Sequence, residues 1–499
     1  MGRVFWRKSA QKWDIGGLEA EKMVRARSSN LLGRITILVM VGLCVNTAMA
    51  LDGSGTEGNP WRIQSLEDFN EFAADANYWD DYTRLETDVN LAGLTYITAV
   101  IAPDIDNSDN DFDGTAFIGV FDGNDKRIIN LTIDDGGAGN DYLGVFGCID
   151  GGEIKNLGIE GGSVVGNGSF NGGLAGRNSG GVSNCYSTGE VRGSGYSCVG
   201  GLVGENYYGN VSNCYSTGDV SGDYLDVGGL VGVNRYGYVS DCYSTGDVSG
   251  NHVVSALVGG NIGSVSNCYS TGDVNGVDSV GGLLGNNSGS VSYCYSTGDV
   301  NGSSYVGSLI GVNHSDFYGS GVSNCYSTGD VSGIHYFVGG LVGYNSSGSF
   351  SNCYSTGDVS GDFDVGGLVG YNRGGSVSNC YSIGDVNGTG DYVGGLVGGN
   401  YSGSFSNCFW DTNTQIHGVT ESIGLNDGDV NNVEGLPTTQ MQTKSTFTDA
   451  NWDFIEIWNI GENQTYPYLR VYLAGDINKD RIVNFLDIAI TANQWLQEQ

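Results

Sequence analysis

The chain has 499 residues and a formal net charge of −35, with 56 acidic against 21 basic side chains. A field of that sign repels nucleic acid and anionic lipid and attracts divalent cations, so nucleic acid is excluded as a partner. The sequence holds 86 glycines but only 4 prolines, and residues 104–436 contain none. Continuous β-sheet fits this absence better than disorder, because a sheet ladder cannot accept a residue that lacks an N–H.

Residues 1–50 are expected to form an export signal. A basic stretch ending at Arg34 precedes the apolar run "ITILVMVGLCV" (35–45), and Ala48-x-Ala50 fits a signal-peptidase site. The apolar run is too short to span a membrane as a mature helix. We therefore expect an extracellular or cell-surface protein with no transmembrane segment in the mature chain.

Residues 51–115 are predicted to form an N-terminal capping region. The stretch "GSGTEGNPWRIQSLEDFNEF" (53–72) places Ser65 and Asp68 where they can cap a short helix. Such a region is needed because an open coil end exposes unpaired strand edges.

Residues 116–412 repeat one motif, best seen in "VSNCYSTGDVSG" (211–222). Nine copies place a cysteine in one column at steps of 26 to 31 residues: Cys185, Cys214, Cys242, Cys268, Cys294, Cys325, Cys353, Cys380 and Cys408. Two earlier copies, at 128–133 and 154–159, carry leucine there. A propeller blade needs about 40 residues, so this period favours a solenoid. We predict an all-β fold, a parallel β-helix of about eleven coils roughly 4.8 Å apart.

The early copy "IKNLGI" (154–159) indicates which residues face inward. Its apolar residues Ile154, Leu157 and Ile159 break strict alternation at Asn156, which we expect to be a left-handed corner. This register places valine, cysteine and the second serine of each copy inside, and tyrosine outside. Stacked corner asparagines could also bond amide to amide, although Asp241 and Tyr293 interrupt their column. The cysteines are predicted to be free, buried thiols, because in-register side chains point the same way and oppose disulfide geometry.

Two outward columns are candidate binding surfaces. The aromatic column contains Tyr186, Tyr215, Tyr243, Tyr269, Tyr295, Tyr326, Tyr354 and Tyr381, followed by Phe409. Its rings could stack on sugar rings of a polysaccharide, or could stack on each other and shield the sheet. The acid column contains Glu190, Asp219, Asp247, Asp273, Asp299, Asp330, Asp358 and Asp385. These carboxylates are either solvated, each accepting N–H bonds from a turn, or bridged by cations.

The motif "GGLVGxNxxGxVSNCYSTGDVxG", as at 228–250, resembles the GLUG repeat of bacterial surface and secreted proteins. The resemblance implies an exported, adhesive role and supplies no catalytic residue. The stretch "WDFIEIWNIGENQTYPYL" (452–469) resembles the closing segment of such proteins. We therefore expect residues 413–472 to form a C-terminal capping region.

The tail 473–499 contains "GDINKDRIVNFLDIAITANQWL" (475–496), which resembles one calcium-binding repeat of a dockerin. The resemblance implies a small helical module that binds Ca²⁺ and docks to a cohesin-like or cell-surface protein. In EF-hand order its loop offers Asp476, Asn478, Asp480, the Ile482 carbonyl, Asn484 and Asp487. Arg481 departs from the usual glycine, and one repeat is present where dockerins normally carry two.

No catalytic centre is evident. Cleavage of a polysaccharide needs clustered carboxylates, or calcium with an arginine or lysine base. The arginines of the repeats (Arg177, Arg192, Arg235 and Arg373) occupy variable positions, and the histidines (His252, His314, His335 and His417) share no column. Two functions stay open. The first is a secreted, non-catalytic solenoid that adheres to carbohydrate or other cell-surface material and is attached elsewhere through its tail. The second, less favoured, is a polysaccharide lyase or glycoside hydrolase recruited by its tail.

Overall fold

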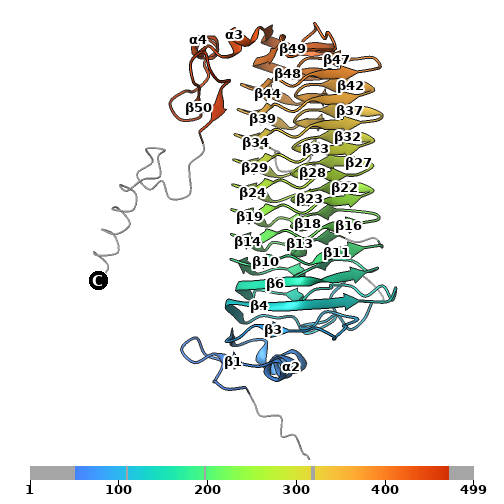
Figure 1. Ribbon diagram of the computed structural model, residues 1–499, viewed down its shortest axis with the longest axis vertical. Coiled ribbons are helices and arrows are strands. Elements are labelled where there is room, and N and C mark those ends of the chain that lie inside the picture. The colour runs from blue at the N-terminus through green and yellow to red at the C-terminus, as the bar shows by residue number, and fades with distance from the viewer. Residues whose placement is uncertain (1–50, 108–110, 196–197, 316–320, 471–499) are drawn as a thin grey trace, which may run out of the picture. The chain divides into compact units, whose positions relative to one another are not determined.

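The computed structural model describes residues 51–107, 111–195, 198–315 and 321–470. Residues 51–436 wind into a parallel β-helix of about eleven coils (Figure 1). The predicted all-β solenoid is therefore confirmed, and separate propeller blades are excluded. The predicted export signal (1–50) and the predicted calcium-binding repeat (473–499) lie outside the described residues.

The N-terminal region covers the first coil with a helix. Strand β1 (Trp61–Ile63) leads into helix α2 (Leu66–Ala74) and the 3-10 helix η1 (Ala76–Tyr78). As predicted, the Ser65 hydroxyl caps α2 by accepting the Asp68 N–H at 3.1 Å. Phe69 and Phe72 are fully buried, and the Phe72 ring lies 5.6 Å from that of Phe121 in the first long strand. The helix therefore seals this end of the apolar core.

Early coils use longer strands, and the central coils use five short ones. The early strands are β2 (Tyr82–Leu85), β3 (Val89–Asn90), β4 (Val120–Asp134), β5 (Phe146–Ile149) and β6 (Glu153–Gly166). A separate nine-stranded sheet contains β7 (Asn171–Gly172), β12 (Val199–Gly200), β17 (Val227–Gly228), β22 (His252–Ser255), β27 (Asp278–Gly281), β32 (Ser304–Gly307), β37 (Tyr336–Gly339), β42 (Phe363–Gly366) and β47 (Val393–Gly394).

The other four strand positions belong to one large sheet. The strands of the "VGxN" segment are β8 (Ala175–Asn178), β13 (Val203–Tyr207), β18 (Val231–Arg235), β23 (Val258–Asn261), β28 (Leu284–Asn287), β33 (Ile310–His314), β38 (Val342–Ser346) and β43 (Val369–Arg373). The "VS" strands are β9 (Gly181–Ser183), β14 (Asn210–Ser212), β19 (Tyr238–Ser240), β24 (Ser264–Ser266), β29 (Ser290–Ser292), β34 (Gly321–Ser323), β39 (Ser349–Ser351) and β44 (Ser376–Ser378). The tyrosine strands are β10 (Tyr186–Ser187), β15 (Tyr215–Ser216), β20 (Tyr243–Ser244), β25 (Tyr269–Ser270), β30 (Tyr295–Ser296), β35 (Tyr326–Ser327), β40 (Tyr354–Ser355) and β45 (Tyr381–Ser382). The strands after the acid are β11 (Glu190–Gly193), β16 (Val220–Gly222), β21 (Val248–Gly250), β26 (Val274–Asn275), β31 (Val300–Gly302), β36 (Val331–Gly333), β41 (Val359–Gly361) and β46 (Val386–Gly388).

Identical residues of successive copies pair with each other across the coils. Tyr215 pairs with Tyr243, for example, in parallel register. The predicted left-handed corner is confirmed, with φ of 54° at Asn156 and 52° at Asn213. Asp241 and Tyr293 adopt the same conformation, each with φ of 55°, so the fold imposes this corner even where asparagine is absent.

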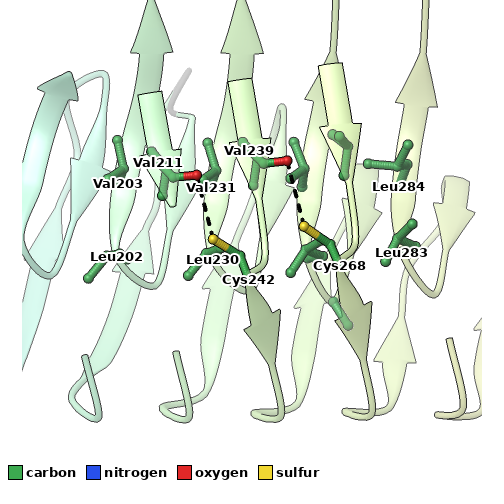
Figure 2. Close-up of a cluster of buried hydrophobic side chains, with 14 of the residues drawn as sticks. Leu202, Val203, Val211, Leu230, Val231, Val239, Cys242, Cys268, Leu283 and Leu284 are labelled. Atoms are coloured by element: carbon green, nitrogen blue, oxygen red, sulfur yellow. Dashed lines mark hydrogen bonds between the residues drawn. The ribbon is translucent and has the colours of Figure 1, made fainter. Parts of the chain in front are cut away.

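The interior is a stack of leucine, valine and cysteine rows. Figure 2 shows Leu202, Leu230 and Leu283 in one row, and Cys242 and Cys268 in another. All cysteines of the described chain are buried, as predicted, and none of them is paired in a disulfide in this structure. The Cys242 thiol donates to the Val211 carbonyl at 3.6 Å (Figure 2).

A second interior row consists of asparagines that the sequence analysis did not single out. They occupy the last position of "GGLVGxN", and each side-chain amide donates to the next along the axis at 2.7–3.0 Å. The members are Asn178, Asn206, Asn234, Asn261, Asn287, Asn313, Asn345, Asn372 and Asn400, which are buried, and Asn426 of the last rung, which is exposed. The ladder expected at the corner asparagines is limited to pairs such as Asn184 with Asn156, at 3.1 Å.

The solenoid extends further than the predicted boundary at residue 412. Strand β48 (Val397–Asp411) is followed by one more rung, β49 (Ile423–Leu436). This rung continues the register because Val433 pairs with Cys408 and Asn426 continues the asparagine row. In the described chain β49 pairs with β48 alone, and Val430 of β49 is 42% exposed.

The last described segment, residues 437–470, packs on the outer side of the coils. It contains α3 (Thr438–Met441), α4 (Lys444–Thr448) and the antiparallel pair β50 (Trp458–Asn459) and β51 (Tyr468–Leu469). Its aromatic residues pack against the C-terminal end of the tyrosine column. Of the predicted capping region 413–472, β49 thus forms the last rung of the described coils, and residues 437–470 pack beside the tyrosine column. No helix among the described residues is long and apolar enough to cross a membrane.

Candidate functional site

The rings of the tyrosine column stack on each other. Neighbouring ring centroids from Tyr186 to Tyr381 lie 4.8–5.0 Å apart, with interplanar angles of 1–7°. The ring faces are therefore occupied, and along the column only edges and hydroxyls can reach a ligand. This arrangement matches the alternative in which the rings shield the sheet, and it rules out sugar stacking between neighbouring rings.

The C-terminal segment covers one end of the column. Tyr354 and Tyr381 are only 9% and 1% exposed, with the Trp458 ring centroid 6.1 Å from each. The Tyr381 hydroxyl donates to the Pro467 carbonyl. Burial also raises the pKa of Tyr326, at the margin of the covered part, to about 12. These two buried tyrosines are thus removed from the predicted ligand surface, which leaves a half-buried row from Tyr186 to Tyr326.

The acid column is held by the backbone of the next coil. From Asp219 to Asp358 each carboxylate accepts the N–H of the following aspartate at 2.8–3.2 Å. The column is solvated until Asp385, which is buried and lies 2.5 Å from Nδ1 of His417. No group of three His, Cys, Asp or Glu side chains in the described chain is placed to hold a metal ion.

A charged cluster interrupts the repeat near its N-terminal end. Glu205 of β13 is nearly buried, with Nε of Arg177 at 3.3 Å and Nε of Arg235 at 3.1 Å. Burial raises the pKa of Glu205, and the two guanidinium groups oppose that rise. The Arg177 guanidinium also lies over the Tyr207 ring, 4.4 Å from its centroid. Two of the four repeat arginines, which the sequence analysis placed at unrelated variable positions, are thus brought together.

The cluster borders a concavity of about 540 Å³. Its lining includes Phe112, Asp150, Arg177, Tyr207 and Tyr208. Cys148, at its base, is buried, which raises the pKa of its thiol to about 12. The signal that could have revealed this site is the run of Cys148, Arg177 and Glu205 at one register position, where the next two coils carry Val233 and Gly260.

Another buried acid lies elsewhere on the coils. Asp364 of β42 is 7% exposed, and its Oδ1 has no hydrogen-bond partner. Desolvation raises its pKa to about 6. The four histidines do not form a common site, and the predicted calcium ligands at 476–487 lie outside the described residues.

Comparison with known proteins identifies the repeat. The family described as the GLUG motif matches residues 195–221, 223–249, 276–301, 337–360 and 361–387. The central coils contain GLUG motifs. Halomucin of Haloquadratum walsbyi is 32% identical over 159 residues, which is 30% of this chain and 2% of halomucin. Among solved structures, a Bacteroides ovatus protein provisionally named an immunoglobulin A1 protease shares 18% identity at a TM-score of 0.31. That likeness covers 84% of this chain and 94% of the other.

Proposed function

We propose that the chain is an exported, cell-surface protein that adheres to saccharide-rich material without catalysis. The observation that carries this proposal is the row of phenol groups from Tyr186 to Tyr326, held in register on an outward side of the coils. The GLUG motifs and the likeness to halomucin support a place at the cell surface.

The row suits weak, repeated contacts with a long ligand. A phenol hydroxyl both donates and accepts hydrogen bonds, as sugar hydroxyls do. The stacked rings are already ordered, so binding loses little side-chain entropy. Several such contacts along one polymer add up through high effective concentration rather than through any single strong bond.

The tail would attach this surface to a partner. Asp476, Asn478, Asp480, Asn484 and Asp487 offer side-chain oxygens at EF-hand spacing, with the Ile482 carbonyl between them. In this proposal the loop binds Ca²⁺, and the loaded tail docks to a cohesin-like or other cell-surface protein. Calorimetry of the full chain against a variant lacking 473–499 tests it, because equal calcium binding by both would contradict it.

The test of adhesion removes hydroxyls and keeps the rings. The triple variant Tyr215→Phe, Tyr243→Phe, Tyr269→Phe should bind a glycan array at least about tenfold more weakly, since each lost hydrogen bond is worth about 0.5–1.5 kcal/mol. Its melting temperature should stay near that of the wild type because the ring stack is intact. The control is Tyr336→Phe with Tyr401→Phe, exposed tyrosines outside the row. Wild-type binding by the triple variant would overturn the proposal, and so would release of reducing ends from pectin, alginate or xylan.

A further inference from the structure

We infer that the concavity beside Arg177 is a binding site for a neutral saccharide, separate from the tyrosine row. The inference takes from the proposed function only that the ligand is a saccharide. Its elements are the Arg177 guanidinium, the Asp150 carboxylate and the aromatic side chains of Phe112, Tyr207 and Tyr208.

The charges at this site are not needed by the fold. Arg177 and Glu205 are paired across neighbouring coils, and the next residues in their register are Val233 and Gly260. The same strand position is therefore filled by apolar or small residues a coil later. When an ion pair and a third charge are buried, the desolvation penalty is about as large as the gain from their electrostatic attraction. Stability alone gives no reason for these residues, whereas ligand recognition does.

The cluster holds Arg177 in a fixed orientation. The Glu205 carboxylate forms an ion pair with it on one side, 3.3 Å from Nε, and the Tyr207 ring lies against the guanidinium group. Arg235 shares the charge of Glu205 from the following coil, at 3.1 Å. Arg177 keeps 23% of its side chain exposed and lines the concavity. A rigid, partly exposed fork of donors is suited to hydroxyl groups, and it loses little entropy when it binds.

The walls supply aromatic surface that the tyrosine row lacks. Tyr208 is 62% exposed, and its ring lies edge to face with Tyr207 at 4.7 Å. Phe112, in the segment that precedes β4, also lines the concavity. Pyranose rings present a C–H face to aromatic groups and a rim of hydroxyls to polar ones, which is the combination offered here.

The charge balance selects a neutral sugar over an acidic one. The two arginines and Glu205 together carry one positive charge, whereas Asp111 and Asp150 on the lining carry two negative charges. The whole chain adds a net charge of −35. The carboxylate of a uronate would be repelled by this negative field. Neutral hydroxyls can instead donate to Asp150 and accept from Arg177.

The experiment uses the mature full-length chain and defined hexasaccharides. Calorimetric titration with xylohexaose, cellohexaose and mannohexaose is compared with titration by hexagalacturonate. We expect at least one neutral hexasaccharide to bind, and hexagalacturonate to bind at least tenfold more weakly. Arg177→Met and Tyr207→Ala should each weaken the neutral ligand about tenfold. Arg177→Lys should weaken it too, because the planar fork is lost while the charge remains.

The controls separate this site from the tyrosine row. Arg192→Met removes an exposed arginine paired with Glu190 and should leave affinity unchanged. The row variant Tyr215→Phe, Tyr243→Phe, Tyr269→Phe should still bind the hexasaccharide. Full affinity in both Arg177→Met and Tyr207→Ala would overturn the inference and leave the proposed function standing. Preference for hexagalacturonate would overturn the ligand class. Absence of binding by the wild type to every hexasaccharide would overturn the inference, and a blank glycan array would overturn the proposed function as well.

Discussion

Replacing Asn287 by alanine should destabilise the solenoid far more than a surface substitution. The Asn287 amide oxygen accepts from Asn261 Nδ2 at 2.7 Å and from the Gly289 N–H at 3.2 Å. Its nitrogen donates to Asn313 Oδ1 at 2.8 Å and to the Gly289 carbonyl at 3.2 Å. The variant removes all four hydrogen bonds, whose partner groups are Asn261 Nδ2, Asn313 Oδ1 and the N–H and carbonyl of Gly289. At roughly 0.5–1.5 kcal/mol for each lost bond, the expected loss is about 2–6 kcal/mol.

Urea unfolding followed by tryptophan fluorescence measures this loss, and native-state hydrogen exchange at the Gly289 amide localises it. The matched control is Asn301→Ala, which removes an exposed asparagine of the nearby strand β31. This change should alter the free energy of unfolding by under about 0.5 kcal/mol. A loss in Asn287→Ala no larger than that of the control would refute the view that the asparagine row stabilises the stack.

Three further outcomes are expected. Burial raises the pKa of Asp364 to about 6, so the stability of the wild type should fall as pH rises from about 4 to 6. The variant Asp364→Asn should not show that fall, and its melting temperature at pH 7.5 should be higher than that of the wild type. Equal pH profiles of the two melting temperatures would contradict this. Trp458→Ala should speed proteolysis within 437–470 and spare the coils, whereas Ile455→Ala, at a 75% exposed residue, should not. The 11 described cysteines should resist a thiol reagent in the native protein and all react after unfolding without reductant; three or fewer reactive thiols would indicate disulfides.

The repeat made the architecture predictable because its constraints are local. A residue that must adopt a left-handed conformation, such as Asn156, shows itself by breaking the apolar alternation. Once that corner is placed, the burial of Cys214 and the outward direction of Tyr215 follow from register. Stacking of the tyrosine rings likewise follows from the spacing of the coils, and it was one of the two arrangements foreseen.

Contacts between segments that are distant in the sequence could not be predicted from the repeat. The sequence near Trp458 does not indicate whether its side chain packs against Tyr354 and Tyr381, as it does, or over the last coil. Arg177 and Arg235 converge on Glu205 only because three successive coils are in register. A comparison of consensus positions does not show this contact, because these three residues depart from the consensus. The asparagine row was visible as a constant letter, but its inward direction is shown by side-chain hydrogen bonds between coils, which the consensus does not mark.

Among the described residues, the edge of β49 that faces away from β48 is unpaired, and this has a consequence for self-assembly. An unpaired strand edge is a template to which another extended chain can add itself through backbone hydrogen bonds. Asp427, Asp429 and Glu434 lie along that strand, so a second copy approaching edge to edge would bring its own carboxylates against them. We expect this repulsion to keep fibres from growing at the one end of the coils that α2 does not close.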